Sequence, residues 1–235
     1  SQHQVSFNDT TSDIIWLVAP WIWQSIPKAL LVNKKVVCTI HHQVPEKFDE
    51  QKLQDFKDRD KYVDVYHVPC EKTKNFISRI TQKPIKVLGY WYNKLSWKHL
   101  NKQDLREKWG FVNNELLIAS FQRDSEGANP NNPKLEKGPD LFFQYISRLS
   151  LSRKVHILLA GWRRNYLINK LNQANIPYTY HELADQQTLN EMYSLADFYV
   201  IASRCEGGPQ ALLESPACGT PVISTNVGMA QEVLP

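Results

Sequence analysis

The sequence lacks the marks of several protein classes, and each absence narrows the function. Its 235 residues include no run of eighteen apolar residues, the length that predicts a membrane-spanning helix. Lys and Arg (28) intermix with Asp and Glu (24), so no basic stripe for nucleic acid is evident. The G-x-G-x-x-G motif of a dinucleotide-dependent oxidoreductase is also missing. What remains, 42% apolar and 22% charged residues, is ordinary for a soluble globular protein.

Cysteine is scarce as well. The four cysteines, Cys38, Cys70, Cys205 and Cys218, are widely separated and form no C-x-x-C pair. We therefore expect free thiols in a reducing compartment and no metal site, which favours a cytoplasmic protein. Cys205 stands beside Glu206, but no His lies near it in the sequence, so a packing role is favoured over a nucleophilic one.

Apolar runs alternate with helical patterns along the chain, which predicts βαβ units and an α/β fold with mostly parallel sheets. We expect strands at 13–20, 35–40, 63–68, 85–88, 116–121, 155–160, 178–180, 198–203 and 221–224. We expect helices at 21–31, 50–60, 71–80, 103–109, 141–149, 166–174, 189–195 and from Pro209 onward. The aromatic-rich segment 89–101 breaks this periodicity, so we place one domain at 1–100 and a second at 101–235.

The most informative stretch lies near the end of the chain. A strand-like run, 198–203, is followed by Glu206-Gly207-Gly208-Pro209 and then by a helical pattern. Glycine lets a ligand approach the backbone closely, and proline suits the first position of a helix. The free N–H groups of the next turn and the helix dipole both favour negative charge. The order of strand, glycine turn and helix therefore predicts an anion site.

Two carboxylates frame this anion site. Glu206 stands before the turn, and Glu214 lies further along the helix, with a side chain that leans back toward the helix N-terminus. One carboxylate can then reach one end of a ligand while the other reaches hydroxyl groups further along it. A nucleotide sugar, with its sugar, diphosphate and ribose, has this layout.

The spacing of the two glutamates resembles the E-x7-E signature of retaining glycosyltransferases of the GT-B fold, in particular glycosyltransferase family 4. Further motifs match that family in the same order: S-F-Q-R at 120–123, K-G-P-D-L at 137–141, L-N-E-M-Y-S-L-A-D at 189–197 and G-T-P-V-I at 219–223. The resemblance is specific in the second half of the chain and weaker in the first.

The resemblance implies two Rossmann-like domains, of which the N-terminal, acceptor-side domain is incomplete here and the C-terminal domain binds the donor. It implies a hexosyltransferase that moves a sugar from a nucleoside-diphosphate sugar to an acceptor hydroxyl, with retention of configuration and without a metal. No cofactor is expected, because the nucleotide sugar is a substrate. A carbohydrate or lipid-linked acceptor is expected, nucleic acid is not, and the aromatic first half leaves peripheral membrane contact open.

The same resemblance assigns roles to residues of the second half. Arg123 at a strand end and Lys137 at a helix start face the charge that grows on the departing diphosphate. No Asp-x-Asp metal motif lies in a suitable place, although the two cations could also be ordinary surface residues. Glu206 acts at the donor sugar, and Glu214 accepts hydrogen bonds from the ribose hydroxyls. Since proline has no N–H, the remaining donor contacts are expected from Gly207, Gly208, Gln210 and Ala211.

A histidine pair follows a strand in the first half. The sequence Thr39-Ile40-His41-His42 is similar to the T-x-H-D of the family, where the His lies near the reaction centre. A residue just past the carboxyl end of a strand points into the crevice of an α/β sheet. The resemblance therefore implies a catalytic His41, with a purely structural histidine as an equal alternative. His42 stands where the family has Asp, and its part is open.

The chain is shorter than the family pattern, which leaves several interpretations open. A fragment, a split enzyme and a reduced acceptor domain all fit, and we rank the fragment first. A non-catalytic nucleotide-sugar-binding subunit that needs a partner chain is the main functional alternative, and a GT-B epimerase or phosphorylase ranks lower. The sequence does not name the sugar, the base, the acceptor or the oligomeric state.

Overall fold

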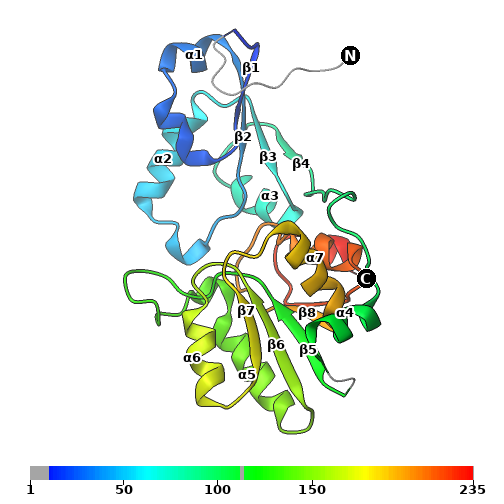
Figure 1. Cartoon of the computed structure of the whole chain (residues 1–235). Helices are drawn as coiled ribbons and strands as arrows, with labels where there is room; N and C mark the ends of the chain where they lie inside the picture. Colours follow the sequence, from blue (N-terminus) through cyan, green and yellow to red (C-terminus); the bar gives the residue numbers. More distant parts are fainter. Residues whose placement is uncertain (1–10, 112–113, 235) are drawn as a thin grey trace. The chain divides into compact units, whose positions relative to one another are not determined.

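The computed structural model describes residues 11–111 and 114–234, and the chain divides into two compact units, Ser1–Gly89 and Tyr90–Pro235 (Figure 1). Each unit has its own parallel sheet with helices packed against it. The α/β class and the parallel pairing expected from the sequence are therefore confirmed.

The first unit has a four-stranded sheet in the order β1-β2-β3-β4. Its strands are β1 (Ile14–Leu17), β2 (Lys35–Thr39), β3 (Val65–Val68) and β4 (Ile85–Val87). Its helices are η1 (Pro20–Ser25), α1 (Lys28–Asn33), η2 (Pro45–Lys47), α2 (Glu50–Asp60) and α3 (Glu71–Ile77). Because every crossover steps to the next strand in the same direction, the right-handed rule places α1, α2 and α3 on one face.

The core of the first unit lies between that face and the helices. Leu17, Val36 and Tyr66 are fully buried on alternate strand positions, and Phe56 of α2 stacks on Tyr66 with ring centroids 5.3 Å apart. On the opposite face Trp16 remains 56% exposed. Alternation with a period of two thus sorts the strand residues between a covered face and an open one.

One expected helix of the first unit is wrong in its extent. The pattern at 21–31 predicts a single helix, but the structure has η1, an extended Ile26 (φ −93°, ψ 132°) and then α1, which starts after Pro27. Proline disfavours the helical conformation in the residue before it and offers no N–H to continue a helix. The apolar periodicity continues through this break, so the pattern alone does not reveal it.

The second unit has a five-stranded sheet in the order β7-β6-β5-β8-β9, with all pairs parallel. Its strands are β5 (Leu116–Ser120), β6 (Val155–Ala160), β7 (Tyr178–His181), β8 (Phe198–Ile201) and β9 (Val222–Ser224). Its helices are α4 (Lys102–Trp109), η3 (Leu135–Lys137), α5 (Pro139–Ser150), α6 (Asn165–Gln173), α7 (Gln186–Leu195), α8 (Ala211–Ala217) and α9 (Ala230–Val233).

Helices cover both faces of this second sheet. Residues of α5 and α6 share one buried cluster with Ile118, Ile157 and Val200 on alternate strand positions, while α7 and α8 pack on β5 and β8 (Figure 1). From β5 the chain proceeds outward through β6 and β7, then returns to the other side of β5 for β8 and β9. The strand order therefore reverses between β5 and β8, and in such sheets ligands bind beyond the carboxyl ends of the strands at this point.

A buried ion pair ties the carboxyl ends of β5 and β6 together. Arg164 is fully buried; its Nε donates to Asp124 Oδ2 at 2.9 Å, and its Nη1 donates to the carbonyl oxygens of Ser120 (2.6 Å) and Ala160 (2.9 Å). A buried guanidinium needs this many acceptors, because an unpaired buried charge is strongly destabilising. The pair thus fixes the backbone on which the neighbouring cavity is built.

The segment that joins the units packs on the second one. The backbone N–H of Lys98 donates to Asn190 Oδ1 at 2.9 Å, and that of Leu100 donates to Ser194 Oγ at 3.3 Å. The compact units accordingly divide between Gly89 and Tyr90, whereas the sequence-based domains divide after residue 100.

Candidate functional site

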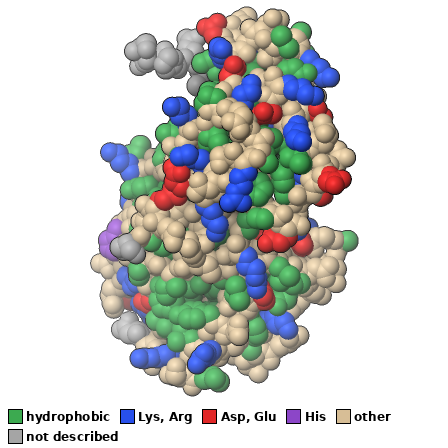
Figure 2. Space-filling model, turned by 180° about the vertical axis from the view of Figure 1, so that it is seen from behind, with side chains coloured by type: hydrophobic (Ala, Val, Ile, Leu, Met, Phe, Trp, Pro, Cys, Tyr) green, Lys and Arg blue, Asp and Glu red, His purple; other side chains and the backbone are tan. Residues whose placement is uncertain are grey.

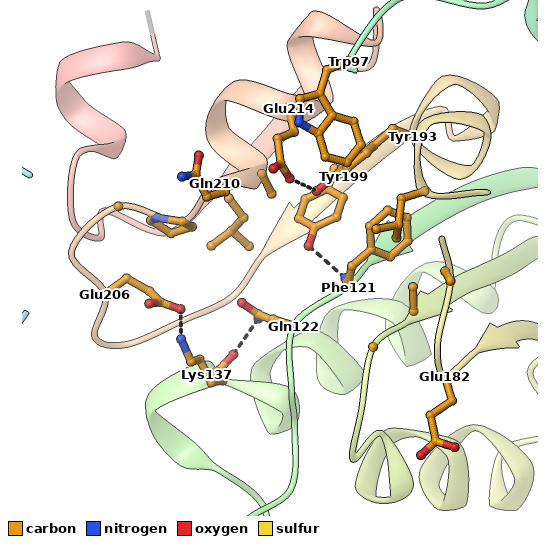
Figure 3. A pocket seen from close by; sticks show the side chains of 18 residues that line it. Trp97, Phe121, Gln122, Lys137, Glu182, Tyr193, Tyr199, Glu206, Gln210 and Glu214 are labelled. Atoms are coloured by element: carbon orange, nitrogen blue, oxygen red, sulfur yellow. Dashed lines mark hydrogen bonds and ion pairs between the residues drawn. The ribbon is translucent and has the colours of Figure 1, made fainter. Parts of the chain in front are cut away.

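A cavity of about 450 Å³ opens at the carboxyl ends of β5 and β8 in the second unit (Figure 3). Its polar and aromatic lining includes Trp97, Phe121, Gln122, Lys137, Glu182, Tyr193, Tyr199, Glu206, Gln210 and Glu214. The cavity therefore lies at the reversal of strand order, and it brings together both glutamates of the E-x7-E spacing.

The glycine turn before α8 is tightly packed. A Cβ added at Gly208 would lie 2.6 Å from Tyr90 Cδ2 and 3.0 Å from Met229 Sδ. Gly207 is buried, and its carbonyl oxygen would lie 2.2 Å from a Cβ added at Gly228, which has a φ of 53°. The absence of a side chain at Gly208 and at Gly228 is thus required by neighbouring protein groups, in addition to any need for a ligand to approach.

The helix after this turn begins later than expected. The sequence places Pro209 at its first position, but α8 begins at Ala211, with Gln210 as its N-cap in the αR region (φ −58°, ψ −30°). The backbone N–H of Leu212 reaches only to Pro209 O at 3.0 Å, so the chain enters α8 through a tighter turn. The backbone N–H groups of Gln210 and Ala211 have no acceptor among the described residues. Both residues line the cavity.

Lys137 and Glu206 form an ion pair on the cavity wall. Lys137 Nζ contacts Glu206 Oε1, and Ser203 Oγ lies 3.3 Å from the same oxygen (Figure 3). Gln122 extends this network, since its Nε2 donates to Lys137 O at 2.8 Å and its Oε1 lies 3.0 Å from Ser203 Oγ. The side chains of Lys137 and Glu206 are only 23% and 11% exposed, so water screens this pair less than a surface pair.

The position of Lys137 depends on the glycine that follows it. Gly138 has a φ of 61°, and a Cβ there would lie 1.8 Å from Ala202 O. Only glycine adopts this left-handed conformation while the backbone of the loop after β8 passes so close. The K-G pair found in the sequence therefore seats Lys137 beside the loop that carries Glu206.

Glu214 lies on another stretch of the cavity wall, on α8. Its Oε2 accepts a hydrogen bond of 3.0 Å from the hydroxyl group of Tyr193 on α7 (Figure 3). Burial raises the pKa of the Glu214 carboxyl, and the Tyr193 hydrogen bond partly opposes that shift. The two glutamates are thus supported differently, Glu206 by a cation and Glu214 by a neutral donor.

Gly207, next to the lining residue Gly208, is itself absent from the cavity lining, and two further expected site residues lie elsewhere. Arg123 is absent from the cavity lining; its Nε donates to Ser125 O at 2.7 Å, and its guanidinium carbon lies 5.5 Å from the ring centroid of Trp162. His41 belongs to the first unit, where its Nε2 lies 2.8 Å from Val18 O. The roles assigned to both residues stay predictions.

The sequence did not reveal several polar and aromatic cavity residues, among them Trp97, Gln122, Tyr193 and Tyr199. Gln122 and Tyr193 stand inside the quoted motifs, but no feature of the pattern separates a cavity residue from a core residue. Tyr199 and Tyr193 fall on apolar positions of a strand and a helix, where aromatic packing is the ordinary interpretation. Their hydroxyl groups indicate that each side chain makes a hydrogen bond, but the sequence does not identify the partner of that bond.

Comparison with known families decides what this second unit is. The family model described as glycosyl transferases group 1 matches residues 101–235, which is more than half of the chain. The chain belongs to the glycosyl transferases group 1 family. A search of curated proteins found no significant match.

Solved structures of similar fold were found at low sequence identity. Sucrose-phosphate synthase from Thermosynechococcus elongatus superimposes with a TM-score of 0.76 at 19% identity, over 94% of this chain and 57% of that one. Anabaena Alr3699/HepE in complex with UDP and glucose superimposes with a TM-score of 0.73 at 15% identity, over 96% of this chain and 62% of that one. A glycosyltransferase from Rickettsia africae superimposes with a TM-score of 0.68 at 18% identity, over 94% of this chain and 60% of that one.

These likenesses confirm the GT-B type of fold expected from the sequence. The chain spans 57% to 62% of the length of these three structures, so the comparison covers part of each. At this identity the likeness establishes the fold alone.

Two further observations concern the described residues as a whole. No helix among them is long and apolar enough to cross a bilayer. No group of three or more His, Cys, Asp or Glu side chains in the described ranges is arranged to hold a metal ion. Figure 2 shows Lys and Arg interspersed with Asp and Glu on the face of each unit that it displays.

Proposed function

We propose that the cavity of this group 1 chain binds a nucleoside-diphosphate sugar and serves the transfer of its sugar to an acceptor hydroxyl with retention of configuration. The observation that carries the proposal is the meeting of Glu206, Lys137 and Glu214 in one cavity at the reversal of strand order. The cavity falls within the 300–1,000 Å³ range, roughly, of small-molecule sites. Anabaena Alr3699/HepE, which shares the fold, has been solved with UDP-glucose.

In this proposal Lys137 stabilises the leaving group. Its ammonium is now paired with Glu206, and the diphosphate of a bound donor competes for that charge. When the bond between the sugar C1 and the phosphate oxygen breaks, negative charge grows on the diphosphate, and a fixed cation is most effective against such developing charge. Arg123 would supply a second cation only after leaving Trp162, so we assign it a secondary part.

The two glutamates hold the ends of the donor. Glu206 accepts hydrogen bonds from the sugar hydroxyls and favours the positive charge that develops at C1. Glu214 accepts hydrogen bonds from the ribose hydroxyls. The turn between them supplies the backbone N–H groups of Gln210 and Ala211, which have no other acceptor among the described residues.

Retention follows if the acceptor oxygen attacks C1 on the face that the diphosphate leaves. The bond from C1 to the acceptor oxygen then forms as the bond to phosphate breaks, and the acceptor proton passes to the departing phosphate oxygen. No protein base and no metal is needed for this step, and His41 of the first unit would act only on the sugar. Membership of family 4, a polysaccharide or lipid-linked acceptor, a cytoplasmic location and peripheral membrane contact belong to the same proposal.

Calorimetry tests the donor site. We expect the wild-type chain to bind UDP or GDP and Glu214→Ala to lose that binding. Glu107→Ala, which removes an exposed carboxylate from α4 of the same unit, should bind as the wild type does. Unchanged nucleotide affinity in Glu214→Ala would refute the role of Glu214.

A turnover assay separates the enzyme from the non-catalytic alternative. We expect release of nucleoside diphosphate from UDP-glucose or another donor in the presence of an acceptor, equally with and without EDTA, and NMR of the product to show a retained anomeric configuration. The chain spans only 57% to 62% of the compared structures. Nucleotide binding without turnover would favour the alternative, a non-catalytic nucleotide-sugar-binding subunit or fragment that needs a partner chain.

A further inference from the structure

The residue that carries the further inference is Tyr193, on α7. Its side chain is buried, with the residue only 3% exposed, yet its hydroxyl reaches the cavity and donates to Glu214 Oε2 at 3.0 Å. Glu214 Oε1 accepts no hydrogen bond among the described residues. A buried phenol thus occupies one oxygen of the carboxylate and leaves the other for a ligand.

Aromatic neighbours hold the Tyr193 ring in place. Its centroid lies 4.7 Å from that of Phe121, 5.3 Å from that of Tyr199 and 5.4 Å from that of Trp97, and the Phe121 and Trp97 contacts are T-shaped. Edge-to-face packing at such distances restricts ring rotation, because interior groups have little room to move. The backbone is fixed as well, since Thr220 Oγ1 donates to Tyr193 O at 2.6 Å. The hydroxyl therefore points at one place.

We propose that Tyr193 is a positioning residue for nucleotide binding: it holds the Glu214 side chain in one rotamer, as an ionised carboxylate, with a free oxygen directed at the ribose hydroxyls. The inference rests on the proposed function, because it concerns how the same cavity recognises the sugar of the nucleotide. Tyr193 touches Glu214, and it acts on the ligand only through that residue.

The electrostatic setting supports this role. Burial raises the pKa of Glu214, so a protonated carboxyl would compete with ribose recognition, and donation from Tyr193 favours the ionised form. Burial also raises the pKa of Tyr199 to about 12 and that of Cys218 to about 11, so neither neighbour ionises near neutral pH. The His99 imidazole is a further neighbour of Cys218, with Nδ1 3.2 Å from Cys218 O.

The other glutamate of the cavity, Glu206, has a cationic partner in Lys137. Lys137 and Glu206 neutralise each other on a separate stretch of the wall, so Lys137 does not serve as a cationic partner for Glu214. A tyrosine hydroxyl is therefore the one donor that reaches Glu214 among the described residues.

Tyr193→Phe tests the inference, and Tyr199→Phe is its matched control. Both changes remove one hydroxyl from the same aromatic cluster, but the Tyr199 hydroxyl accepts from the Phe121 backbone N–H at 2.8 Å, and among the described residues the hydrogen bond to Glu214 comes from Tyr193. The measurement is the affinity for UDP by calorimetry as a function of pH, with His99→Gln made in each background as a control that removes this imidazole. The pKa of the Glu214 carboxyl group in the free protein is measured by NMR from the chemical shift of its carboxyl carbon.

We expect Tyr193→Phe to weaken UDP binding about tenfold at neutral pH, the effect of losing one hydrogen bond to a charged group. The pH at which affinity begins to fall on acidification should move upward, and the pKa of Glu214 in the free protein should rise. Tyr199→Phe should lower the melting temperature and leave both pH values in place.

Each outcome decides the inference. If the wild type binds UDP and Tyr193→Phe shows the same affinity and the same pH profile, Tyr193 is merely a packing residue and the inference is wrong, while the proposed function stands. If Tyr193→Phe and Tyr199→Phe weaken binding equally, with no shift of the Glu214 titration, the effect is general loosening and the inference is again wrong. If the wild type binds neither UDP nor GDP, the proposed function fails and this inference fails with it.

Discussion

Removal of the Asp124 carboxylate should destabilise the second unit far more than removal of a comparable surface carboxylate. Arg164 and Asp124 have side chains only 0% and 1% exposed, and among the described residues Asp124 is the one anionic partner of the guanidinium. Asp124→Ala leaves that cation buried and uncompensated, which destabilises a protein by about 3–5 kcal/mol. For a unit of this size we expect the melting temperature to fall by roughly 10 °C.

A natural control exists in the same unit. Arg204 and Asp140 form a two-pronged ion pair at 2.7 Å, but their side chains are 42% and 33% exposed. Exposed pairs contribute about 0–1 kcal/mol, so Asp140→Ala should shift the melting temperature by only a few degrees.

Urea and thermal unfolding, followed by circular dichroism, measure both variants. The double change Asp124→Ala with Arg164→Leu should recover most of the stability, because replacement of both members of a buried pair by apolar groups is often nearly neutral. If Asp124→Ala is no less stable than Asp140→Ala, the buried pair does not anchor the ends of β5 and β6.

Three further predictions concern the cavity. Glu214→Gln should make the free protein more stable at neutral pH, because a carboxyl with a raised pKa in the folded state destabilises the fold as pH rises through that pKa. The stability gained by the variant should vanish in acid, and thermal melts across a range of pH measure it. Lys137→Ala should lower kcat by about 10²–10³-fold with a smaller change in KM, and equal kcat in steady-state assays would exclude its action on the leaving group. Gly208→Ala should weaken nucleotide binding and stability together, because its Cβ would lie 2.6 Å from Tyr90 Cδ2; a crystal structure of the variant should show the Tyr90 ring displaced.

Much of the secondary structure follows from local pattern. The helix at 50–60 has the bounds of α2, because Asp49 caps it through the backbone N–H of Lys52 at 2.9 Å. The strand at 155–160 has the bounds of β6, since a run that is apolar except for His156 predicts a strand buried on both faces. Where a proline interrupts an unbroken apolar periodicity, as at Pro27, the pattern predicts one helix and the structure has two.

The site is only partly legible in the sequence. The chain spacing of Glu206 and Glu214, together with the K-G pair at Lys137, predicts residues that the structure brings to one cavity. By contrast, the arginines that follow β5 and β6 differ in their burial. Arg164, after β6, is buried against carbonyl oxygens, while Arg123, after β5, lies against the exposed Trp162. Which arginine is buried depends on partners supplied by tertiary structure, and no local pattern encodes that.

The most direct test of the account is a crystal structure of the chain with UDP. We expect the diphosphate within hydrogen-bonding distance of Lys137 Nζ, at the turn before α8, and the ribose hydroxyls on the oxygen of Glu214 that Tyr193 leaves free. Well-defined nucleotide density away from the carboxyl ends of β5 and β8 would contradict the central claim that this cavity is the donor site.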